Sequence, residues 1–572
     1  MPAVSSLTLE EKIGQMLVVG FPGGAEGLSA LREIVSATAA GNVILFARNA
    51  GAPDELRKTT DAVRSIISER RGLPPLVAVD QEGGVVARVR DGVTSLPGAM
   101  AQAAAVGSGA YGVADIRELA RIAGTELLAL GMDWDLAPVA DVNVNPLNPV
   151  IGVRSYGQDP ASVAELATAF AAGLADAGVL ATAKHFPGHG DTTVDSHLDL
   201  PLVPHSAERL EAVELIPFRA LVRSLVPVIM TAHVRFPAYE SEPIPATLSR
   251  KVITGLLRGA LGFRGIIATD CMEMKAIAGR FPDAAVMAVE AGCDMITVSQ
   301  SAEAQLAAFR SILAAVASGR IAESRIDESV ARILAAKASV GDPPEWAGAR
   351  ADLRSPRSLA LAEGIMEAAL SLLREGAGLP PAPGSLYVDT RPEGLSAAEN
   401  PHPRAGSGVV AGVASGAAAP GTVAASLAHL SGLEVVSLGP DPGEGERAAV
   451  LARAAEILAR PATRGGRGLP GIIMGAHNAP KYPGQLALAA ALSKACAAAG
   501  RPFALCCMRG PYDTAAIERA AGVPLPALCA FEYTPLSAAK IAKYLTGGIR
   551  AAGRCPVEPY ATPDGYFSKE VI

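Results

Sequence analysis

Short apolar runs alternate with longer Ala- and Leu-rich stretches through the first 340 residues, and this pattern constrains the fold more than any other feature. Eight of the runs have the length and composition of β-strands, at residues 16–21, 43–46, 76–80, 133–137, 181–185, 226–232, 265–270 and 295–299. Each is separated from the next by enough chain for a crossover helix, and apolar strands alternating with helices are typical of parallel α/β sheets. Eight such strands favour a (β/α)8 barrel over an open doubly wound sheet.

Charged or polar residues end several of these predicted strands. Asp80, Lys184, His185, His233 and Asp270 lie at or just past the carboxyl ends. A barrel gathers the carboxyl ends of its strands around one mouth, where the following loops form the active site. The sequence therefore predicts that these side chains share one functional site.

The composition changes after Lys337, where the segment GDPPEWAGARADLRSP contains three prolines and several charges. Such a segment is typical of an interdomain connector. We assign residues 1–340 to the barrel, 341–355 to a linker and 356–572 to a smaller α/β domain. Strands are expected in that domain at residues 385–389, 432–438, 471–475 and 503–508. The small-residue stretch 407–421 lacks the Lys and Ser/Thr of a phosphate loop, so we expect a plain loop there.

Composition narrows the class of protein. Half of the residues are hydrophobic and 19% are charged, as in well-packed globular proteins. The net charge of −7, without a basic block, argues against a nucleic-acid or anionic-membrane partner. No apolar run reaches membrane-spanning length, and the amino terminus lacks the pattern of a secretory signal. Seven scattered cysteines without a C-x-x-C pair suit a reducing compartment. We therefore expect a cytoplasmic protein, and nothing in the sequence indicates its oligomeric state.

Histidines cluster in one part of the chain. Five of the eight lie between residues 185 and 233, and three of these fall in KHFPGHGDTTVDSH, residues 184–197. The glycines and the proline make this segment a loop after the fifth strand, and loops at a barrel mouth carry function more often than packing. The cluster could bind a metal, stabilise a long loop or supply acid/base chemistry.

Metal binding is the weaker of the two chemical interpretations. The ligands of a zinc or di-metal site would come from His185, His189, Asp191, Asp195, His197 and Asp199. No HExxH or similar helical pair is present, however, so we expect neither a metal nor an organic cofactor. Individually, His189 and Asp191 are expected to be structural.

Acid/base chemistry is the interpretation that we favour. Asp195 and His197 are close enough on the loop for the carboxylate to accept the imidazole N–H, which orients the ring and favours its protonated form. Such an imidazole can protonate a leaving oxygen and later deprotonate a water. Asp270, which ends the run GIIATD, is the best candidate for the nucleophile that this chemistry requires.

These segments resemble those of a known family. KHFPGHGDTTVDSH resembles the loop of the β-N-acetylglucosaminidase branch of glycoside hydrolase family 3. Further similar segments are LTLEEKIGQMLVVGF, GNVILFARN, PLVAVDQEGGVVARV, IGVRSYGQDP, MTAHVRFPAYE, PATLSR and LRGALGFRGIIATDCMEMKAI. They occur in the family's order over nearly all of residues 6–340. CMRGPYDTAAI, residues 507–517, resembles the α/β sandwich domain of the two-domain members.

The resemblance implies a role for each candidate residue. Asp270 corresponds to the family's nucleophile, and Asp195 with His197 corresponds to the dyad that replaces the usual carboxylic acid/base in this branch. The residues that correspond to the family's sugar-binding side chains are Asp80, Arg88, Arg154, Lys184 and His185. The implied fold is the (β/α)8 barrel followed by the smaller α/β sandwich domain.

The activity implied is that of a retaining exo-β-N-acetylglucosaminidase, a β-N-acetylhexosaminidase that acts through a covalent glycosyl-enzyme. It would release terminal GlcNAc from β-linked conjugates such as peptidoglycan or chitin fragments, and an intracellular enzyme of this kind suggests peptidoglycan recycling. Two positions depart from the family pattern. Val85 replaces the usual Arg after DQEGG, and Cys271 replaces the Asp that commonly follows the nucleophile; we expect Cys271 to be a small packed residue.

Three alternatives remain beside this interpretation. A neutral imidazole does not repel an incoming anion, so the same site could transfer the sugar to phosphate as a β-N-acetylglucosaminide phosphorylase. A β-glucosidase of the same fold usually takes its acid/base from the second domain and lacks the Asp-Ser-His loop. A non-catalytic sugar-binding protein would not need Asp195, His197 and Asp270 together.

Overall fold

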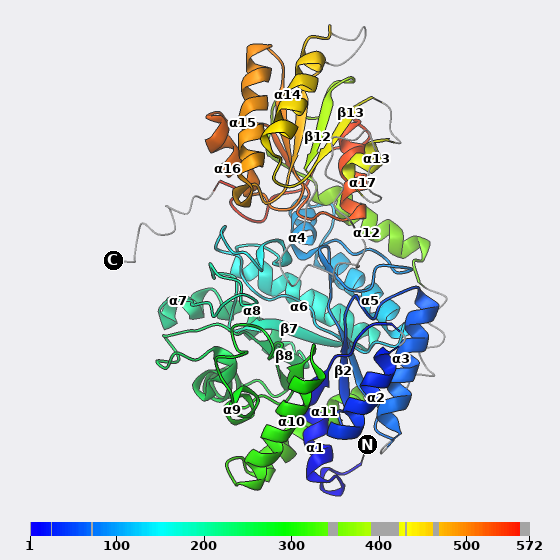
Figure 1. The fold of residues 1–572 in the computed structure, drawn as a ribbon, viewed down its shortest axis with the longest axis vertical. Coiled ribbons are helices and arrows are strands. Elements are labelled where there is room, and N and C mark those ends of the chain that lie inside the picture. Colours follow the sequence, from blue (N-terminus) through cyan, green and yellow to red (C-terminus); the bar gives the residue numbers. More distant parts are fainter. Residues whose placement is uncertain are drawn as a thin grey trace.

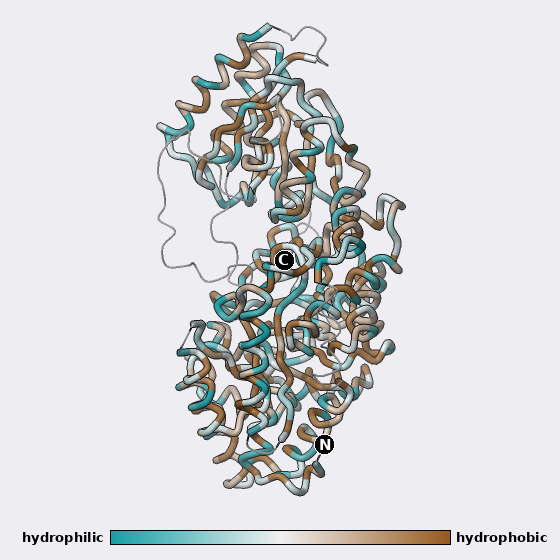
Figure 2. The backbone as a smooth tube through the Cα atoms, turned by 90° about the vertical axis from the view of Figure 1, so that its right-hand side faces the viewer, coloured by the Kyte–Doolittle hydropathy of each residue, from teal (hydrophilic) through white to brown (hydrophobic). Residues whose placement is uncertain are grey.

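The structure, a computed structural model, describes residues 2–24, 26–69, 72–340, 353–390, 422–428, 432–461 and 468–560. These residues form two α/β bodies, which are drawn one above the other in Figure 1. Figure 2 shows from the side that apolar segments run through both bodies. Within the described ranges, no helix combines the length and the hydropathy that crossing a membrane requires.

The lower body is built around an eight-stranded sheet in the order β10-β1-β2-β3-β6-β7-β8-β9. Its neighbouring strands are parallel, and a parallel bridge between Ala268 and Met295 links β9 to β10 and closes the barrel. The strands are β1 (Leu17–Val19), β2 (Asn42–Leu45), β3 (Leu76–Val79), β6 (Trp134–Asp135), β7 (Leu180–Phe186), β8 (Val228–Thr231), β9 (Ile266–Thr269) and β10 (Ile296–Val298). Each overlaps one of the eight predicted strands, so the predicted barrel is confirmed.

Helices surround the barrel. They are α1 (Leu9–Met16), α2 (Gly27–Thr38), α3 (Pro53–Ser68), α4 (Ala99–Gly107), α5 (Val113–Ala129), α6 (Pro160–Ala177), α7 (Ala207–Ala212), α8 (Leu215–Arg223), the π-helix η4 (Lys251–Ala260), α9 (Ala284–Ala291), α10 (Ala302–Ala317) and α11 (Glu323–Ser339). Short 3-10 turns occur at η1 (Val4–Ser6), η2 (Gly152–Arg154) and η3 (Ala246–Leu248).

The limits of α6 show how local sequence sets these elements. The Asp159 side chain accepts the Ser162 N–H at 2.8 Å and so satisfies one of the donors that a helix start leaves free. Pro160 follows in the first turn, where its missing N–H costs nothing. Gly178 ends the helix with a φ of +87°, a conformation that glycine adopts without strain.

A β-hairpin interrupts the barrel pattern directly after β3. It consists of β4 (Gln81–Gly83) and β5 (Val86–Ala87), which pair antiparallel. The buried Gln81 amide holds the following segment, because its Nε2 donates to the Val89 carbonyl at 2.8 Å and its Oε1 accepts the Val89 N–H at 3.1 Å. The hairpin therefore has a fixed position at the carboxyl end of β3, where a barrel carries its active site.

The upper body contains a six-stranded sheet in the order β11-β16-β15-β14-β12-β13. All neighbours are parallel except β11, which is antiparallel to β16. The strands are β11 (Ser371–Arg374), β12 (Leu386–Thr390), β13 (Glu434–Leu438), β14 (Ile472–Ala476), β15 (Phe503–Cys507) and β16 (Ala527–Cys529). Helices on this sheet are α13 (Val423–Ala428), α14 (Glu444–Leu458), α15 (Pro483–Ala498), α16 (Asp513–Ala521) and α17 (Pro535–Leu545), with a 3-10 turn η6 (Ala479–Lys481).

The four strands predicted for this body correspond to β12, β13, β14 and β15. The sequence did not predict β11 or β16, which are short, and β11 is only partly buried, so neither has a long apolar run. The predicted loop 407–421 and most of the predicted linker lie outside the described residues. The domain limits stay a prediction.

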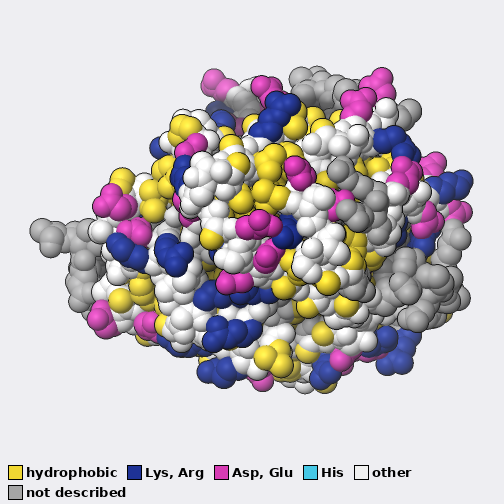
Figure 3. All heavy atoms as spheres, turned by 90° about the horizontal axis from the view of Figure 1, so that it is seen from below, with side chains coloured by type: hydrophobic (Ala, Val, Ile, Leu, Met, Phe, Trp, Pro, Cys, Tyr) yellow, Lys and Arg dark blue, Asp and Glu magenta, His cyan; other side chains and the backbone are white. Residues whose placement is uncertain are grey.

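Helix α12 (Pro356–Ala369) lies at the junction of the two bodies (Figure 1). It packs on α4 and α5 of the barrel and on α17 of the upper body. Backbone bonds also cross the junction: the Arg554 N–H donates to the Ala104 carbonyl at 3.1 Å, and the Gln158 N–H donates to the Pro556 carbonyl at 3.2 Å. Seen from below, the lower body carries acidic and basic side chains interspersed on its surface (Figure 3).

Candidate active site

A cavity of about 550 Å³ opens at the carboxyl ends of the barrel strands. Seven of the eight predicted site residues line it: Asp80, Arg88, Arg154, Lys184, His185, His197 and Asp270. The eighth, Asp195, lies beside His197. All the described residues that line this cavity come from the barrel, and none of those described in the upper body reaches it. The structure thus brings the predicted site together from strands and loops that are far apart in sequence.

Asp270 follows β9 and faces the cavity. Its Oδ1 accepts the backbone N–H of Cys271 at 2.6 Å, which fixes the carboxylate. Burial would raise the pKa of Asp270, but the imidazoles of His233, His185 and His197 and the Cys271 N–H outweigh it, so the pKa is lowered. The group is therefore ionised at neutral pH, as a carboxylate nucleophile must be.

Asp195 and His197 form a pair on the loop after β7. Asp195 Oδ1 lies 2.8 Å from His197 Nδ1 and accepts the backbone N–H of His197 at 2.9 Å. Burial would raise the pKa of Asp195, yet the bonds to His197 lower it, so the carboxylate stays ionised. Because Asp195 engages Nδ1, Nε2 is the ring nitrogen available to a molecule in the cavity that His197 lines.

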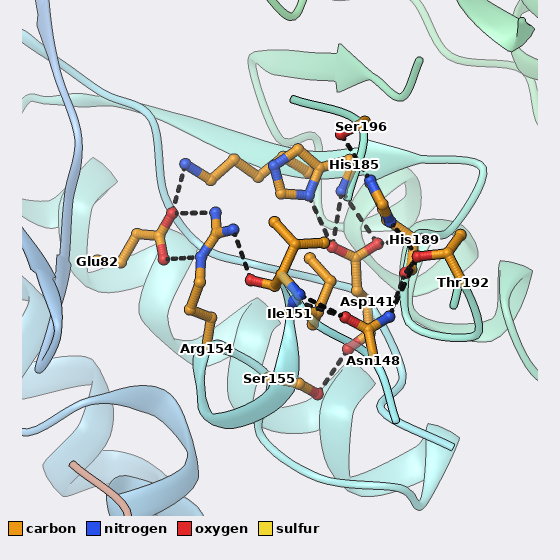
Figure 4. Close-up of polar contacts among 12 residues, drawn as sticks. Glu82, Asp141, Asn148, Ile151, Arg154, Ser155, His185, His189, Thr192 and Ser196 are labelled. Carbon is orange, nitrogen blue, oxygen red and sulfur yellow. Dashed lines mark hydrogen bonds and ion pairs between the residues drawn. The ribbon is translucent and has the colours of Figure 1, made fainter. Parts of the chain in front are cut away.

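A second part of the site is a charged cluster, which consists of Asp80, Glu82, Arg88, Arg154 and Lys184. The Lys184 Nζ lies 2.8 Å from Asp80 and 2.6 Å from Glu82. Arg154 donates to both oxygens of Glu82, at 2.7 and 2.9 Å (Figure 4). The Arg88 guanidinium lies 3.6 Å from Asp80. All five side chains are largely buried, and each lies beside at least one opposite charge.

The cluster shifts the pKa of its members toward their charged forms. Burial would raise the pKa of Glu82, but Arg154 and Lys184 lower it to about 2. Lys184 and Arg88 lower the pKa of Asp80 despite its burial. Burial would lower the pKa of Lys184, but Asp80 and Glu82 raise it. Glu82, Asp80 and Lys184 are consequently charged at neutral pH.

Asp141 organises the histidine loop and was not among the predicted site residues. Its Oδ2 lies 2.7 Å from His185 Nδ1, and its Oδ1 accepts the backbone N–H of His189 at 2.6 Å (Figure 4). Burial would raise its pKa, but His185 and His189 lower it. Asp141 lies six residues after β6, at the end of the apolar segment LAPVAD. A carboxylate in so apolar a segment was the one sequence signal that could have identified Asp141 as a site residue.

Two other neighbours complete the site. Glu82 lies on β4, two residues after the predicted Asp80, and was not among the predicted site residues. His233, predicted at a strand end, has its Nδ1 2.8 Å from Thr247 Oγ1 and its Nε2 3.1 Å from the Cys271 carbonyl. Burial lowers its pKa. His233 therefore braces the loop that carries Asp270.

The candidate metal ligands of the histidine loop are each engaged with other partners. His189 Nδ1 lies 2.8 Å from Thr192 and its Nε2 2.9 Å from Ser196, while burial lowers the pKa of His189 to about 4. Asp191 lies 2.5 Å from His205 Nε2, and Asp199 pairs with Arg280. Among the residues that the structure describes, no three His, Cys, Asp or Glu side chains are grouped as metal ligands.

Comparison with known proteins identifies the family. Residues 8–336 match the model of the glycosyl hydrolase family 3 N terminal domain, which covers more than half of the chain. The chain belongs to glycosyl hydrolase family 3.

Relatives extend this match over both bodies. A family 3 β-N-acetylglucosaminidase from Paenibacillus sp. has a solved structure that is 37% identical, with a TM-score of 0.82, over 97% of this chain and 100% of that one. A β-hexosaminidase of Alkalilimnicola ehrlichii is 42% identical over 273 residues, which are 47% of this chain and 76% of the relative. A β-N-acetylhexosaminidase structure from Beutenbergia cavernae is 30% identical with a TM-score of 0.52, and it covers 58% of this chain and 99% of its own.

The two departures from the family pattern lie in different surroundings. Cys271 lines the cavity with its Sγ 3.0 Å from Ser299 Oγ, and burial raises the pKa of the thiol to about 11. It is a packed thiol, as predicted, and not a thiolate at neutral pH. Val85 is buried in the hairpin turn next to Glu532 of the upper body.

Proposed function

We propose that this family 3 chain is a retaining exo-β-N-acetylglucosaminidase, which releases terminal GlcNAc from β-linked conjugates. The observation that carries the proposal is a single cavity lined by Asp270, by His197 with its Asp195 partner, and by the charged cluster. The full-length similarity to a family 3 β-N-acetylglucosaminidase supports the substrate class.

We assign the nucleophile to Asp270. Its carboxylate attacks the anomeric carbon and forms a glycosyl-enzyme, while the bond to the leaving oxygen breaks. The low pKa of Asp270 and the N–H bond from Cys271 support this role, because both keep the carboxylate ionised and in place.

We assign the acid/base to His197. Protonated His197 gives its Nε2 proton to the departing oxygen, and the neutral ring then removes a proton from the water that attacks the glycosyl-enzyme. Asp195 orients the ring through Nδ1 and stabilises the imidazolium. Most glycosidases use two carboxylates, and here the imidazole takes the place of one.

We assign sugar binding to the charged cluster and His185. The Asp80 carboxylate can accept two sugar hydroxyls, while Arg154, Lys184 and Arg88 donate to hydroxyl or acetamido oxygens. Glu82 holds Arg154 by two bonds, so the guanidinium is already oriented before the sugar arrives. In this proposal, no metal or organic cofactor takes part.

We further propose that the natural substrates are peptidoglycan or chitin fragments and that the enzyme serves cell-wall recycling in the cytoplasm. The seven cysteines, all within the described residues, are free thiols, which suits a reducing compartment. A carbohydrate is the expected partner, and nucleic acid is not.

The test is a panel of p-nitrophenyl glycosides, assayed with and without inorganic phosphate, with the sugar product identified. We expect the β-GlcNAc glycoside to be cleaved clearly faster than the β-glucoside, with free GlcNAc as product. Faster cleavage of the β-glucoside would refute the substrate class. Formation of a sugar 1-phosphate would make the protein a phosphorylase acting through the same glycosyl-enzyme.

A further inference from the structure

The upper body contacts the charged cluster's hairpin through a buried carboxyl. Glu532 follows β16 and is 1% exposed. Its Oε2 accepts the backbone N–H of Gly98 in the barrel at 2.5 Å, and its Oε1 accepts the Thr534 hydroxyl at 2.6 Å. Phe531 beside it is fully buried and has a φ of +63°, a strained backbone for a bulky residue. The segment is thus held in one conformation at the junction.

Glu532 packs against the turn of the β4–β5 hairpin. A Cβ on Gly84 would lie 2.7 Å from the Cα of Gly98 and 3.0 Å from Oε2 of Glu532, so the turn tolerates only glycine there. The Gly84 N–H donates to the Leu96 carbonyl at 2.8 Å. The turn is therefore clamped between the 96–98 segment and the Glu532 carboxyl, and Glu82 is two residues before Gly84.

A small void joins Glu532 to the charged cluster. Its volume is about 10 Å³, and its wall includes Glu82, Arg154, Val85, Phe531 and Glu532. A void of this size holds at most one water. Glu532 and the residues of the Glu82–Arg154 pair therefore share the wall of one small void.

Glu82 on β4 and Arg154 on η2 line the same void as Glu532, and Arg90, which follows β5, is the charge that acts on it. Burial raises the pKa of Glu532 to about 7, against the bonds from Thr534 and Gly98 and the attraction of Arg90, all of which favour the ionised form. An ionised carboxylate is the stronger acceptor, so ionisation strengthens the bond from the Gly98 N–H that ties Glu532 to the barrel.

We propose that Glu532 is a positioning residue by which the upper body holds the Glu82 hairpin, and through it Arg154, in the geometry that binds the sugar. The proposal rests on the sugar-binding role given to the charged cluster above. Ionised Glu532 holds the 96–98 segment and the hairpin turn most firmly, and protonation loosens this support. The affinity for the sugar should therefore rise as the pH rises through about 7.

The test compares the KM and kcat of three variants with those of the wild type between pH 5.5 and 8.5, roughly ±1.5 units around the titration, on the aryl glycoside that the wild type cleaves best. Glu532→Gln keeps the shape and mimics the neutral acid, whereas Glu532→Ala removes the support. Gln158→Ala is the matched control, because it removes one other bond across the junction, from the Glu558 N–H at 2.8 Å, without touching the hairpin.

We expect Glu532→Ala to raise KM about tenfold with a much smaller change in kcat, as expected when ground-state binding is lost. The KM of the wild type should fall as the pH rises across pH 7, and that of Glu532→Gln should stay at the low-pH value throughout. Gln158→Ala should behave like the wild type. The proposal is overturned if the wild type and Glu532→Gln share one KM–pH profile, or if Glu532→Ala lowers only the melting temperature.

If Glu532→Ala does not fold, the comparison of the wild type with Glu532→Gln still decides the outcome. The proposed function fails separately, because it requires the wild type to prefer the β-GlcNAc glycoside. The role of Glu532 can be measured on any glycoside that the wild type cleaves.

Discussion

Replacing His197 by alanine tests the acid/base assignment most sharply. The structure holds the ring by two bonds to one oxygen of Asp195, at 2.8 Å from Nδ1 and 2.9 Å from the backbone N–H, which leaves Nε2 to the substrate. General acid catalysis contributes roughly 10²- to 10⁴-fold to a rate, mostly for leaving groups that need protonation. We therefore expect kcat for phenyl β-GlcNAc to fall by about 10²- to 10⁴-fold. The dinitrophenyl glycoside has a leaving group that needs no protonation, so its glycosyl-enzyme should form at nearly the wild-type rate.

The loss in Asp195→Ala should be smaller, because the imidazole remains but its partner is gone. A hydrogen bond to a charged group contributes about 1.5–3 kcal/mol. If this contribution is made fully only in the transition state, where the ring loses or gains its proton, the rate falls by about 10- to 150-fold. The pH profile of kcat should also shift in this variant.

The assay follows steady-state release of each phenol with and without azide. Deglycosylation limits His197→Ala on the dinitrophenyl glycoside, and azide should rescue turnover by attacking the glycosyl-enzyme directly. The matched control is His205→Ala, which breaks a second His–Asp pair of the same region, Nε2 to Asp191 at 2.5 Å, outside the cavity. Equal losses for all leaving groups without azide rescue would remove His197 from the mechanism. Loss of wild-type activity on chelation, restored by zinc, would favour a metal site. A lower melting temperature of His197→Ala without either kinetic effect would indicate that the loop has only a structural role.

Three further predictions concern other parts of the site. Asp270→Asn should lose several orders of magnitude in kcat. In the wild type, a mechanism-based fluoro-sugar should label Asp270, as located by mass spectrometry. A label on another carboxylate would contradict the assignment. Glu82→Gln should lower the free energy of unfolding by about 3–5 kcal/mol, because it leaves Arg154 buried without its partner. Since the pKa of Glu82 falls from 4.5 to about 2 on folding, the contribution of Glu82 to the free energy of unfolding is present above pH 4.5 and is lost as the pH falls toward 2. Equal urea unfolding curves for the wild type and Glu82→Gln at pH 7 would refute this. Cys271, with its pKa raised to about 11, should resist iodoacetamide at neutral pH, and rapid labelling of this cysteine would show that the thiol is not packed as described.

Much of the fold could be predicted because its signals are local. Eight apolar runs separated by helical stretches indicate a parallel barrel, and every one of them overlaps an observed strand. In the upper body the longer strands were found, but β11 and β16 were not. Those two short strands are stabilised by pairing with a neighbour that is distant in the chain, from Ser371 to Cys529. Such pairing leaves no periodic pattern in the sequence.

The candidate residues could likewise be predicted where a short stretch of sequence defines their position. Asp80, Lys184, His185 and Asp270 end strands, and strand ends converge in a barrel. Asp195 and His197 are neighbours on one loop, so their pairing follows from their spacing alone. Chemistry of this kind is visible in a sequence because it depends on residue type and on nearby spacing.

Only the tertiary structure decided which buried charges support these residues. Asp141 reaches His185 across 44 positions of the chain, Glu82 holds Arg154 across 72, and Glu532 meets the Gly98 N–H across 434. A carboxylate in an apolar segment reveals that it must have a partner, because an unpaired buried charge is costly. Which partner it has depends on where the fold brings the chain back, and burial then sets the protonation of the pair. The sequence by itself thus determined the barrel and offered the candidate reacting groups, whereas the fold decided how those groups are held.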